Sequence, residues 1–430
     1  MSLRQRFAQL AAASAISQAL PMAMAPLLTR VFGAETLGQW AWFAAVAASL
    51  ATVANARYEY AIPLPRRRAE AGLLLALALG LSLVAGLATA LLAWGLAALP
   101  GGTLSGRWSQ VTWLRDYALP LAAAVALSGL QQALALWNNR HGRFAAIAQA
   151  RVGQQVVLAA AQLAAWASGW LAAAALVGAQ LLSLLLPPLW LWWRGQPLRL
   201  HGARTAAAAR RRWGRLRALA WRYRQFPLLN SPHAFINGLQ EAVALSLIAA
   251  YAGVAAAGWY AVMVRLVKAP ATLVGGALSE ALLSRLAEDW REGRSLRPTL
   301  ARAMRGLLLP AVLGAALLAV VGPALFGWAL GADWAPAGEY ARWFAPYVAA
   351  HFVCAPLTVT PMVTQRQRGA LGFSLVGNAL YALALAAVLG AGRPVTQALG
   401  AVSVVMPLYF AAYLAWLYRG AVPATSAVGT

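Results

Sequence analysis

The sequence predicts an all-α integral membrane protein with about twelve transmembrane helices. Hydrophobic residues make up 61% of the chain and charged residues only 11%, and this composition is far outside the soluble globular range. Apolar stretches near or above the ~20 residues needed to cross a bilayer recur along the chain. Basic residues fall mainly into every second gap between these stretches. The predicted spans are about 8–32, 38–63, 71–99, 117–138, 147–167, 171–193, 228–252, 257–284, 306–330, 339–364, 369–390 and 395–418.

The basic residues also predict the orientation of the spans. One set of gaps holds most of the 35 lysines and arginines. The opposite set holds only Arg30, Arg107, Arg115, Arg342 and Arg393. Because positively charged loops stay in the cytoplasm, we expect both termini to be cytoplasmic. The net charge of +24 is spread over many loops, which favours contact with inner-membrane lipids over binding to nucleic acid.

Composition also limits the chemistry. Cys354 is the only cysteine, so an intramolecular disulfide and a cysteine-based metal site are excluded. The sequence brings together no paired carboxylates, glycine-rich phosphate loop or other catalytic constellation. We therefore expect a transporter rather than an enzyme, with no metal and no organic cofactor.

The longest cytoplasmic gap divides the predicted spans into two sets of six. We predict an N-terminal lobe over 1–193, an arginine-rich linker over 194–227 with an interfacial helix, and a C-terminal lobe over 228–430. Gly33 and Gly38 recur as Gly253 and Gly258, at a constant offset that also superimposes span on span. Six spans is an even number, so the lobes are related by a parallel repeat, with a central cavity for substrate expected between them.

Polar residues inside the predicted spans are the candidate binding residues, because ionisable groups in hydrocarbon usually face a cavity or one another. Arg265 and Lys268 share one face of the span 257–284, and Glu241 lies at a similar depth on the preceding span, so an ion pair is plausible. The alternative is that these charges only hold two helices together. The predicted cavity residues are Arg265, Lys268, Glu241, Asn230, His233, Asn237, Gln240 and Gln18.

Other ionisable residues suggest coupling and gating. His351 lies in the middle of a predicted span, where it would carry a coupling proton or act as a hydrogen-bonded packing residue. With Glu241 it is the candidate site for a coupling ion, H⁺ or Na⁺. Arg57, Glu59 and Glu280 lie at predicted cytoplasmic span ends and are the candidate gating residues.

Three stretches resemble the polysaccharide (O-antigen) flippases of the multidrug/oligosaccharidyl-lipid/polysaccharide (MOP) exporter superfamily. They are Leu27-Leu-Thr-Arg-Val-Phe-Gly33, Arg57-Tyr-Glu-Tyr-Ala-Ile-Pro-Leu-Pro65, and Tyr223-Arg-Gln-Phe-Pro227 continued through Gly258-Trp-Tyr260. The resemblance implies a flippase that moves an undecaprenyl-diphosphate-linked oligosaccharide across the bacterial inner membrane for surface polysaccharide synthesis. It also implies contact with a polysaccharide polymerase or glycosyltransferases. An ion-coupled drug exporter of the same superfamily and a membrane polysaccharide polymerase or ligase are the alternatives.

Overall fold

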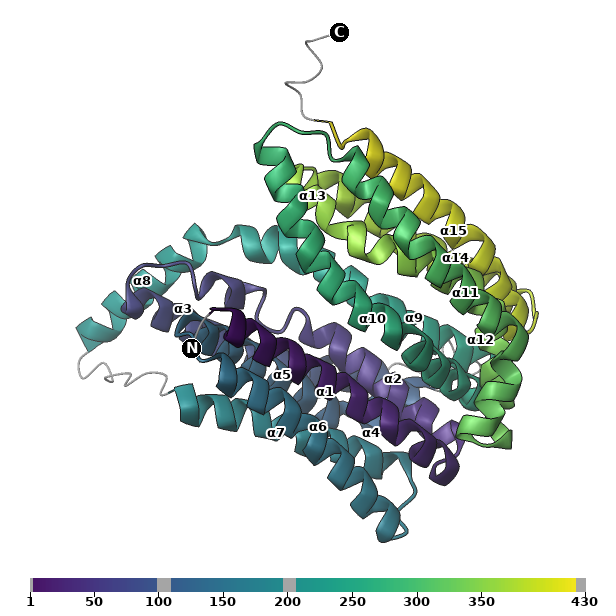
Figure 1. Cartoon of the computed structure of the whole chain (residues 1–430). Coiled ribbons are helices and arrows are strands. Elements are labelled where there is room, and N and C mark those ends of the chain that lie inside the picture. The colour runs from purple at the N-terminus through teal and green to yellow at the C-terminus, as the bar shows by residue number, and fades with distance from the viewer. Residues whose placement is uncertain (1–2, 99–109, 196–205, 423–430) are drawn as a thin grey trace. The chain divides into compact units, whose positions relative to one another are not determined.

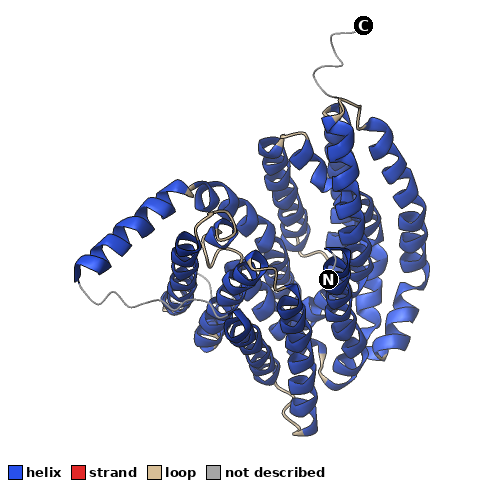
Figure 2. Ribbon diagram, turned by 60° about the vertical axis from the view of Figure 1, so that its left-hand side comes forward, coloured by secondary structure: helices blue, strands red, loops and turns tan. Residues whose placement is uncertain are grey.

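All regular secondary structure in the described part of the chain is helical (Figures 1 and 2). The computed structural model describes residues 3–98, 110–195 and 206–422. The chain forms two compact units, of which the first comprises Met1–Phe32 and Gln39–Ala242 and the second comprises Gly33–Gly38 and Val243–Thr430. Part of the predicted linker, 196–205, lies outside the described residues, and the predicted lobe limits stay a prediction.

The first unit is a bundle in which α3 packs against α5, α6 against α7, and α1 against α6 (Figure 1). A buried cluster of apolar side chains that includes Leu74, Leu134 and Trp137 holds α3 and α5 together. The helices are α1 (Leu3–Val31), α2 (Ala34–Ala51) from Gln39 onward, α3 (Arg68–Ala97), α4 (Gln110–Asp116), α5 (Ala118–Arg140), α6 (Phe144–Ala167), α7 (Ala173–Gly195), α8 (Ala206–Arg222) and the first half of α9 (Ser231–Ala252), with short turns η1 (Tyr58–Ala61) and η2 (Phe226–Asn230).

In the second unit, α12 contacts α10, α11 and α15, and α14 packs on α15. Leu286, Leu300 and Leu417 are among the side chains that form its buried apolar cluster near the ends of α10, α11 and α15. The helices are the second half of α9, α10 (Val254–Arg291), α11 (Arg297–Leu330), α12 (Ala335–Cys354), α13 (Thr360–Val363), α14 (Gln367–Gly390) and α15 (Val395–Arg419), with short 3₁₀ turns η3 (Ala332–Trp334) and η4 (Ala355–Val359).

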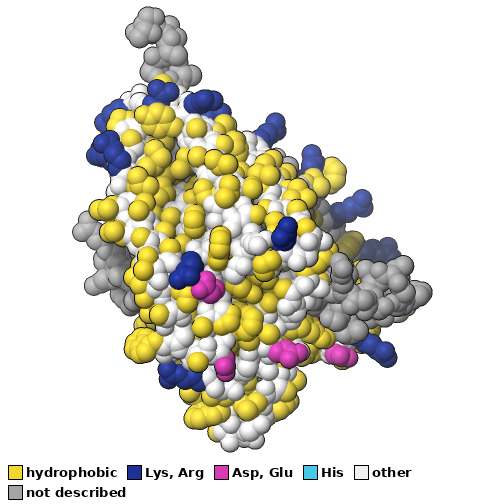
Figure 3. Space-filling view, turned by 90° about the vertical axis from the view of Figure 1, so that its right-hand side faces the viewer, with side chains coloured by type: hydrophobic (Ala, Val, Ile, Leu, Met, Phe, Trp, Pro, Cys, Tyr) yellow, Lys and Arg dark blue, Asp and Glu magenta, His cyan; other side chains and the backbone are white. Residues whose placement is uncertain are grey.

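The outer surface is apolar, as expected for a protein in contact with lipid. Large hydrophobic side chains of α11 are strongly exposed, including Val320 at 74% and Trp328 at 79%. Figure 3 shows hydrophobic side chains over most of the visible face, with isolated charged groups between them. A soluble protein would not expose apolar area on this scale. The surface therefore agrees with a membrane protein.

Eight segments of the described chain are long and apolar enough to cross a membrane. The other four predicted spans fall on helices α1, α2, α6 and α10, whose crossing stays a prediction. Polar residues interrupt these helices, such as Arg151 in α6 and Lys268 in α10. The eight candidate spans are Arg68–Leu96, Ala118–Arg140, Ala173–Gly195, Phe226–Ala252, Arg297–Leu330, Ala332–Val363, Gln367–Gly390 and Val395–Arg419.

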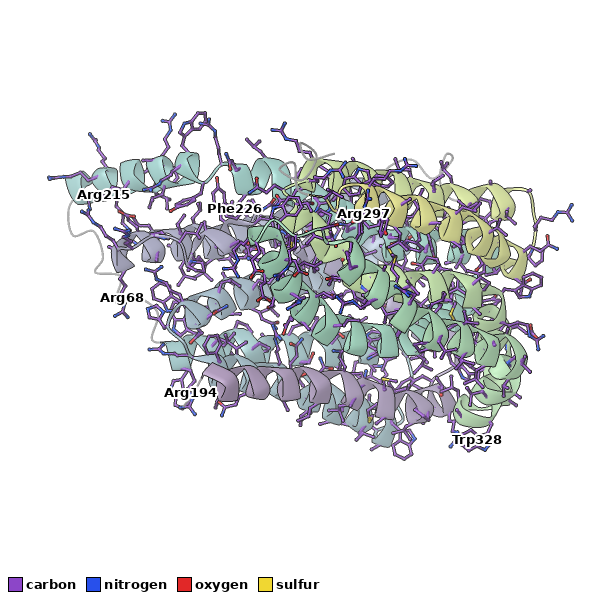
Figure 4. The ribbon with its side chains drawn as sticks, turned by 45° about the horizontal axis from the view of Figure 1, so that its top comes forward. Arg68, Arg194, Arg215, Phe226, Arg297 and Trp328 are labelled. Atoms are coloured by element: carbon purple, nitrogen blue, oxygen red, sulfur yellow. The ribbon has the colours of Figure 1, made fainter. Side chains whose placement is uncertain are left out.

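Arginines gather at one end of the first unit. In Figure 4, Arg68 at the start of α3, Arg194 at the end of α7 and Arg215 of α8 lie on the same side of the first unit. In the second unit, Arg297 and Trp328 lie near opposite ends of α11 (Figure 4). This arrangement agrees with the expected segregation of positive charge to one side of the membrane.

Candidate functional site

A buried ion pair follows α2 in the first unit. The helix ends at Ala51, and the chain then turns through Ala56 and Arg57, both of which have positive φ angles. Such conformations are uncommon for residues other than glycine and often mark functional segments. Arg57 Nη1 lies 3.6 Å from Glu59 Oε1, and the side chains are 17% and 2% exposed. The guanidinium also lies over the ring of Tyr60, 5.4 Å from its centroid.

Two polar atoms of this ion pair make no hydrogen bond to the described residues. Among the described residues, Arg57 Nε and Glu59 Oε2 are buried atoms without a hydrogen-bond partner. Unsatisfied buried polar atoms are rare in native proteins and need an explanation. A charged pair with a spare donor and a spare acceptor can exchange partners when a polar ligand arrives. This property fits the gating role predicted for Arg57 and Glu59, which stays a prediction.

The first half of α9 brings its polar residues close to this ion pair. The turn η2 before α9 contacts η1, and the Ser49 hydroxyl of α2 donates to the Gly238 carbonyl of α9 at 2.6 Å. His233 Nε2 and Asn237 Nδ2 are 3.1 Å apart, and the charge of Arg57 acts on His233. The sequence predicted that these α9 residues share a cavity with the cations of the next span, Arg265 and Lys268. Within the first unit, their cationic neighbour is Arg57.

A second polar network of the first unit was not predicted from the sequence. Asn55 Nδ2 donates to the Gly129 carbonyl of α5 at 2.9 Å, and Ser82 of α3 donates to Asn55 Oδ1. Asn55 and Ser82 are 1% and 0% exposed. The only signal in the sequence is an asparagine shortly before Arg57. The network fixes the segment between α2 and η1 and so positions the ion pair.

In the second unit, Lys268 faces a cluster of aromatic rings. Its ammonium nitrogen lies 5.6 Å from the centroid of the Tyr347 ring. The His351 ring stacks on Tyr347 at 5.7 Å with an interplanar angle of 12°, and Tyr381 meets Tyr347 edge-on. The Tyr381 hydroxyl is 2.6 Å from the hydroxyl of Tyr260. The negative face of the Tyr347 ring attracts the Lys268 ammonium and holds it in this position.

The remaining predicted site residues have diverse environments. Arg265 and Glu280 are exposed on α10. Gln18 is partly buried on α1, and Gln240 is partly buried on α9. Asn230 and Glu241 are exposed in the first unit, and their pairing with Arg265 or Lys268 stays a prediction.

A cavity of about 430 Å³ lies between α10, α11 and α12 of the second unit. Its walls are entirely apolar and include Leu266, Gly314 and Phe352. An apolar cavity at membrane depth suits hydrocarbon but gives a charged headgroup no partner. Arg265 and Lys268 do not line this cavity.

Taken together, the helical spans and embedded charges define an integral membrane protein of the transporter class. The fold agrees with solved transporters over nearly the whole chain. The lipid II flippase MurJ, in an inward closed conformation, superimposes with a TM-score of 0.71 at 10% identity and covers 95% of this chain and 90% of its own. A MOP superfamily transporter from Pyrococcus furiosus gives a TM-score of 0.62 at 12% identity, with 96% and 94% covered. A mutant of the Vibrio cholerae MATE transporter VcmN gives 0.58 at 15% identity, with 97% and 95% covered.

The fold is therefore that of the MOP superfamily. A family model described as polysaccharide biosynthesis protein matches residues 109–339, which is more than half of the chain. The chain belongs to this family, as its resemblance to polysaccharide flippases predicted. A search of curated proteins finds no match.

Proposed function

We propose that this protein is a flippase that moves a polyprenyl-diphosphate-linked oligosaccharide across the bacterial inner membrane, by alternating access, for surface polysaccharide synthesis. The observation that carries the proposal is that two embedded cations, Arg265 and Lys268, fall inside the stretch 109–339 that matches the polysaccharide biosynthesis family. A doubly anionic diphosphate entering a low-dielectric site needs fixed positive charge. The fold similarity to a lipid II flippase supports the same class of substrate.

The proposal assigns a role to each part of the substrate. Arg265 and Lys268 bind the diphosphate, and Lys268 is already held in place by the Tyr347 ring. The polar groups Asn230, His233, Asn237 and Gln240 of α9 hydrogen-bond sugars, with Gln18 contributing from α1. The polyprenyl tail stays in hydrocarbon, because burying an apolar chain among these polar groups gains nothing.

His351 and Glu241 are the proposed groups for an H⁺ or Na⁺ coupling ion. His351 stacks on Tyr347, which also contacts Lys268, so binding of an anion at Lys268 changes the electrostatic field at the imidazole. This connection supports a proton as the coupling ion. Replacement of His351 by glutamine should abolish any dependence of transport on a proton gradient while leaving substrate binding intact.

Replacement of Arg265 by alanine tests the headgroup assignment. In a strain that lacks the native protein, Arg265→Ala should abolish surface polysaccharide and leave lipid-linked repeat units on the cytoplasmic leaflet, at unchanged protein level. Arg265→Lys should retain part of the activity, because it keeps the charge. Arg151→Ala, which removes an exposed arginine from α6, is the control and should export normally. Normal export by the Arg265→Ala variant would rule out Arg265 as the diphosphate site.

A drug exporter is the second candidate, because the fold is also similar to a MATE transporter. Export of cationic drugs requires embedded acidic groups, whereas the deep charges of α10 are basic. Deletion of the gene distinguishes the two candidates. Intact surface glycan together with raised sensitivity to cationic drugs would replace the flippase proposal by the exporter.

A further inference from the structure

A second cavity of the second unit is mainly apolar but has polar side chains in its lining. It has a volume of about 490 Å³ and lies between α12 and α15. Its lining combines a cation, an amide, a hydroxyl and an indole ring with apolar groups. The lining residues are Arg342, Trp343, Pro346, Gln397, Gly400, Ser403 and Val404. A volume of this size with a few convergent polar groups is typical of a small-molecule site.

The position of Arg342 is fixed by a defect in the neighbouring helix. Pro323 interrupts α11 and has no backbone N–H, so the Ala319 carbonyl four residues before it lacks its helical donor. Arg342 Nε supplies the missing hydrogen bond at 2.8 Å. The helices come close enough for this contact because Gly322 and Gly338 pack backbone to backbone one turn away. Arg342 is therefore held rigidly by the fold rather than by a ligand.

The guanidinium of Arg342 is half of a neutral pair. Its Nη1 donates to Glu339 Oε1 at 3.0 Å and lies 3.4 Å from Oε2. Both side chains are partly exposed, at 43% for Arg342 and 41% for Glu339. With Nε and Nη1 occupied, Nη2 is the donor that Arg342 can offer to a ligand. The second lone pairs of the Glu339 carboxylate can accept from a cation, so the pair presents one charge of each sign.

The wall opposite Arg342 offers a buried hydroxyl. Ser403 is 7% exposed, and among the described residues its Oγ has no hydrogen-bond partner. A serine within a helix usually donates to a backbone carbonyl of the preceding turn, so a buried hydroxyl without a partner is unusual. Gln397 lies on the same helix nearer to its start and adds an amide. Gln397 and Ser403 therefore add an amide and a hydroxyl to the cavity that Arg342 also lines.

In the predicted topology, the cavity lies in the outer half of the membrane. At 1.5 Å per residue, Arg342 is about 10 Å from the start of α12, and Ser403 about 12 Å from the start of α15. Both helix starts are on the non-cytoplasmic side in the predicted topology, because Arg342 belongs to the sparse outer set of arginines. Further along α15, Val404 and Leu408 share one face and are 64% and 68% exposed. An apolar track thus leads from the cavity toward the membrane centre.

We propose that this cavity binds a zwitterionic phospholipid whose headgroup carries a primary ammonium, that is, phosphatidylethanolamine. The phosphate binds Arg342 Nη2, with the Gln397 amide and the Ser403 hydroxyl as further donors. The ammonium binds Glu339, which lies about 4.5 Å nearer to the outer surface, one helical turn above Arg342. An acyl chain follows Val404 and Leu408. The order of groups along the membrane normal, from ammonium through phosphate to hydrocarbon, is the order in the lipid itself.

Charge separates this lipid from its competitors. An anionic phosphatidylglycerol would satisfy Arg342 but would place no cation at Glu339. Phosphatidylcholine carries a cation, but its quaternary ammonium has no N–H to donate. Only a primary ammonium satisfies the carboxylate by a charge-assisted hydrogen bond. The inference does not depend on the identity of the transported substrate.

Native mass spectrometry of the purified, delipidated full chain tests the proposal. The protein is titrated with dioleoyl phosphatidylethanolamine, phosphatidylcholine and phosphatidylglycerol. The wild type should bind phosphatidylethanolamine about tenfold more tightly than either competitor, the value of one charge-assisted hydrogen bond. Glu339→Gln should abolish that preference. Ser403→Ala, which is nearly isosteric, should weaken binding of all three lipids about threefold to tenfold.

Arg342→Ala should weaken the binding of all three lipids by more than Ser403→Ala does. The thermal transition of the Arg342→Ala variant shows whether α11 and α12 still pack against each other. Arg115→Ala removes an outer arginine of the first unit and should bind lipid like the wild type. Equal or tighter binding of phosphatidylglycerol by the wild type overturns the proposal. It is also wrong if Glu339→Gln keeps the preference for phosphatidylethanolamine, or if Ser403→Ala leaves the affinities for all three lipids unchanged. If these variants instead shift the mass from dimer to monomer, the cavity is a contact between copies of the chain.

Discussion

Gly38 and Gly258 pack against each other at the starts of α2 and α10. A β-carbon built on Gly38 would lie 2.9 Å from the amide nitrogen of Gly258, and one built on Gly258 would lie 3.1 Å from the amide nitrogen of Gly38. Each would also overlap a carbonyl oxygen of the facing helix, that of Val254 and that of Ala34, respectively. The contact is reciprocal and lies within the second unit, which includes Gly33–Gly38. The glycines that the sequence matched at a constant offset are therefore in direct backbone contact.

This contact predicts that alanine is not tolerated at either glycine. Gly38→Ala and Gly258→Ala each force a methyl group against backbone, which cannot move aside as a flexible side chain would. We expect each variant to lose at least the ~1–3 kcal/mol typical of overpacking. The melting temperature in detergent measures the loss. Gly276→Ala is the matched control on α10, because nothing lies within 4 Å of its β-carbon. Wild-type stability of both test variants would show that the helices do not approach so closely.

The topology is tested at the two ends of α14. Cys354 is buried and is first replaced by alanine to give a cysteine-free background. A cysteine at Gln367 should react with a membrane-impermeant maleimide only after permeabilisation, whereas one at Ala391 should react in intact cells. Both residues are exposed at helix ends, so access of the reagent is limited by the membrane alone. The reverse labelling pattern would invert the orientation.

Asp289 should stabilise the second unit in a pH-dependent manner. Its carboxylate, 4% exposed, lies beyond the predicted span 257–284 and accepts from Thr299 at 2.9 Å and from Arg294 Nε at 3.1 Å. Burial alone would raise the pKa of Asp289. These hydrogen bonds and the charges of Arg285 and Arg294 lower it by more, so the pKa is below its ordinary value. A carboxyl group whose pKa is lowered on folding contributes stability above its unfolded pKa and loses it as the pH falls.

We therefore expect Asp289→Asn to lower the melting temperature at pH 7, and the difference from wild type to shrink below about pH 4. Thermal unfolding in detergent between pH 7 and pH 3 measures both. Glu292→Gln, in the same turn but half-exposed, should change little. A difference that stays constant across this range would show that Asp289 acts through shape rather than charge.

Composition and charge spacing were sufficient to predict a helical membrane protein, because contact with the bilayer determines both. The arginine alternation and the glycine offset describe features that repeat along the chain and need no knowledge of contacts. Individual polar contacts were harder to predict. From the sequence, His233 and Asn237 were predicted to lie near the cations of the following span, because a sequence gives only the depth of each residue along its span. The structure shows that the turn after α2 brings Arg57 close to His233 of α9.

The contact between Arg342 and Ala319 illustrates the same limit. Pro323 reveals that one carbonyl of α11 lacks its helical donor, but not which side chain supplies the replacement. That choice depends on the close packing of Gly322 on Gly338, which sets the register between α11 and α12. The sequence contains Pro323 and both glycines, but it does not show that Gly322 and Gly338 face each other.

The buried pair of Arg57 and Glu59 predicts a double-mutant effect. Arg57→Ala leaves a carboxylate that is 2% exposed without its cation, and breaking a buried pair in this way costs about 3–5 kcal/mol. The 3.6 Å separation and the partial exposure of Arg57 put the expected loss at the lower end of that range. Adding Glu59→Gln removes the uncompensated charge, so the double variant should regain most of the stability. Denaturant unfolding in detergent measures the three free energies.

Transport by the same variants separates packing from function. If Arg57 only neutralises Glu59, the double variant should regain export of polysaccharide along with its stability. If the pair opens to admit a substrate, as its unpartnered Nε and Oε2 atoms suggest, the double variant should fold but remain inactive. Arg66→Ala, which removes an exposed arginine of the same cytoplasmic segment, should leave both properties unchanged. Equal stability of the single and double variants would contradict the buried pair, because the charge of Glu59 would then carry no cost.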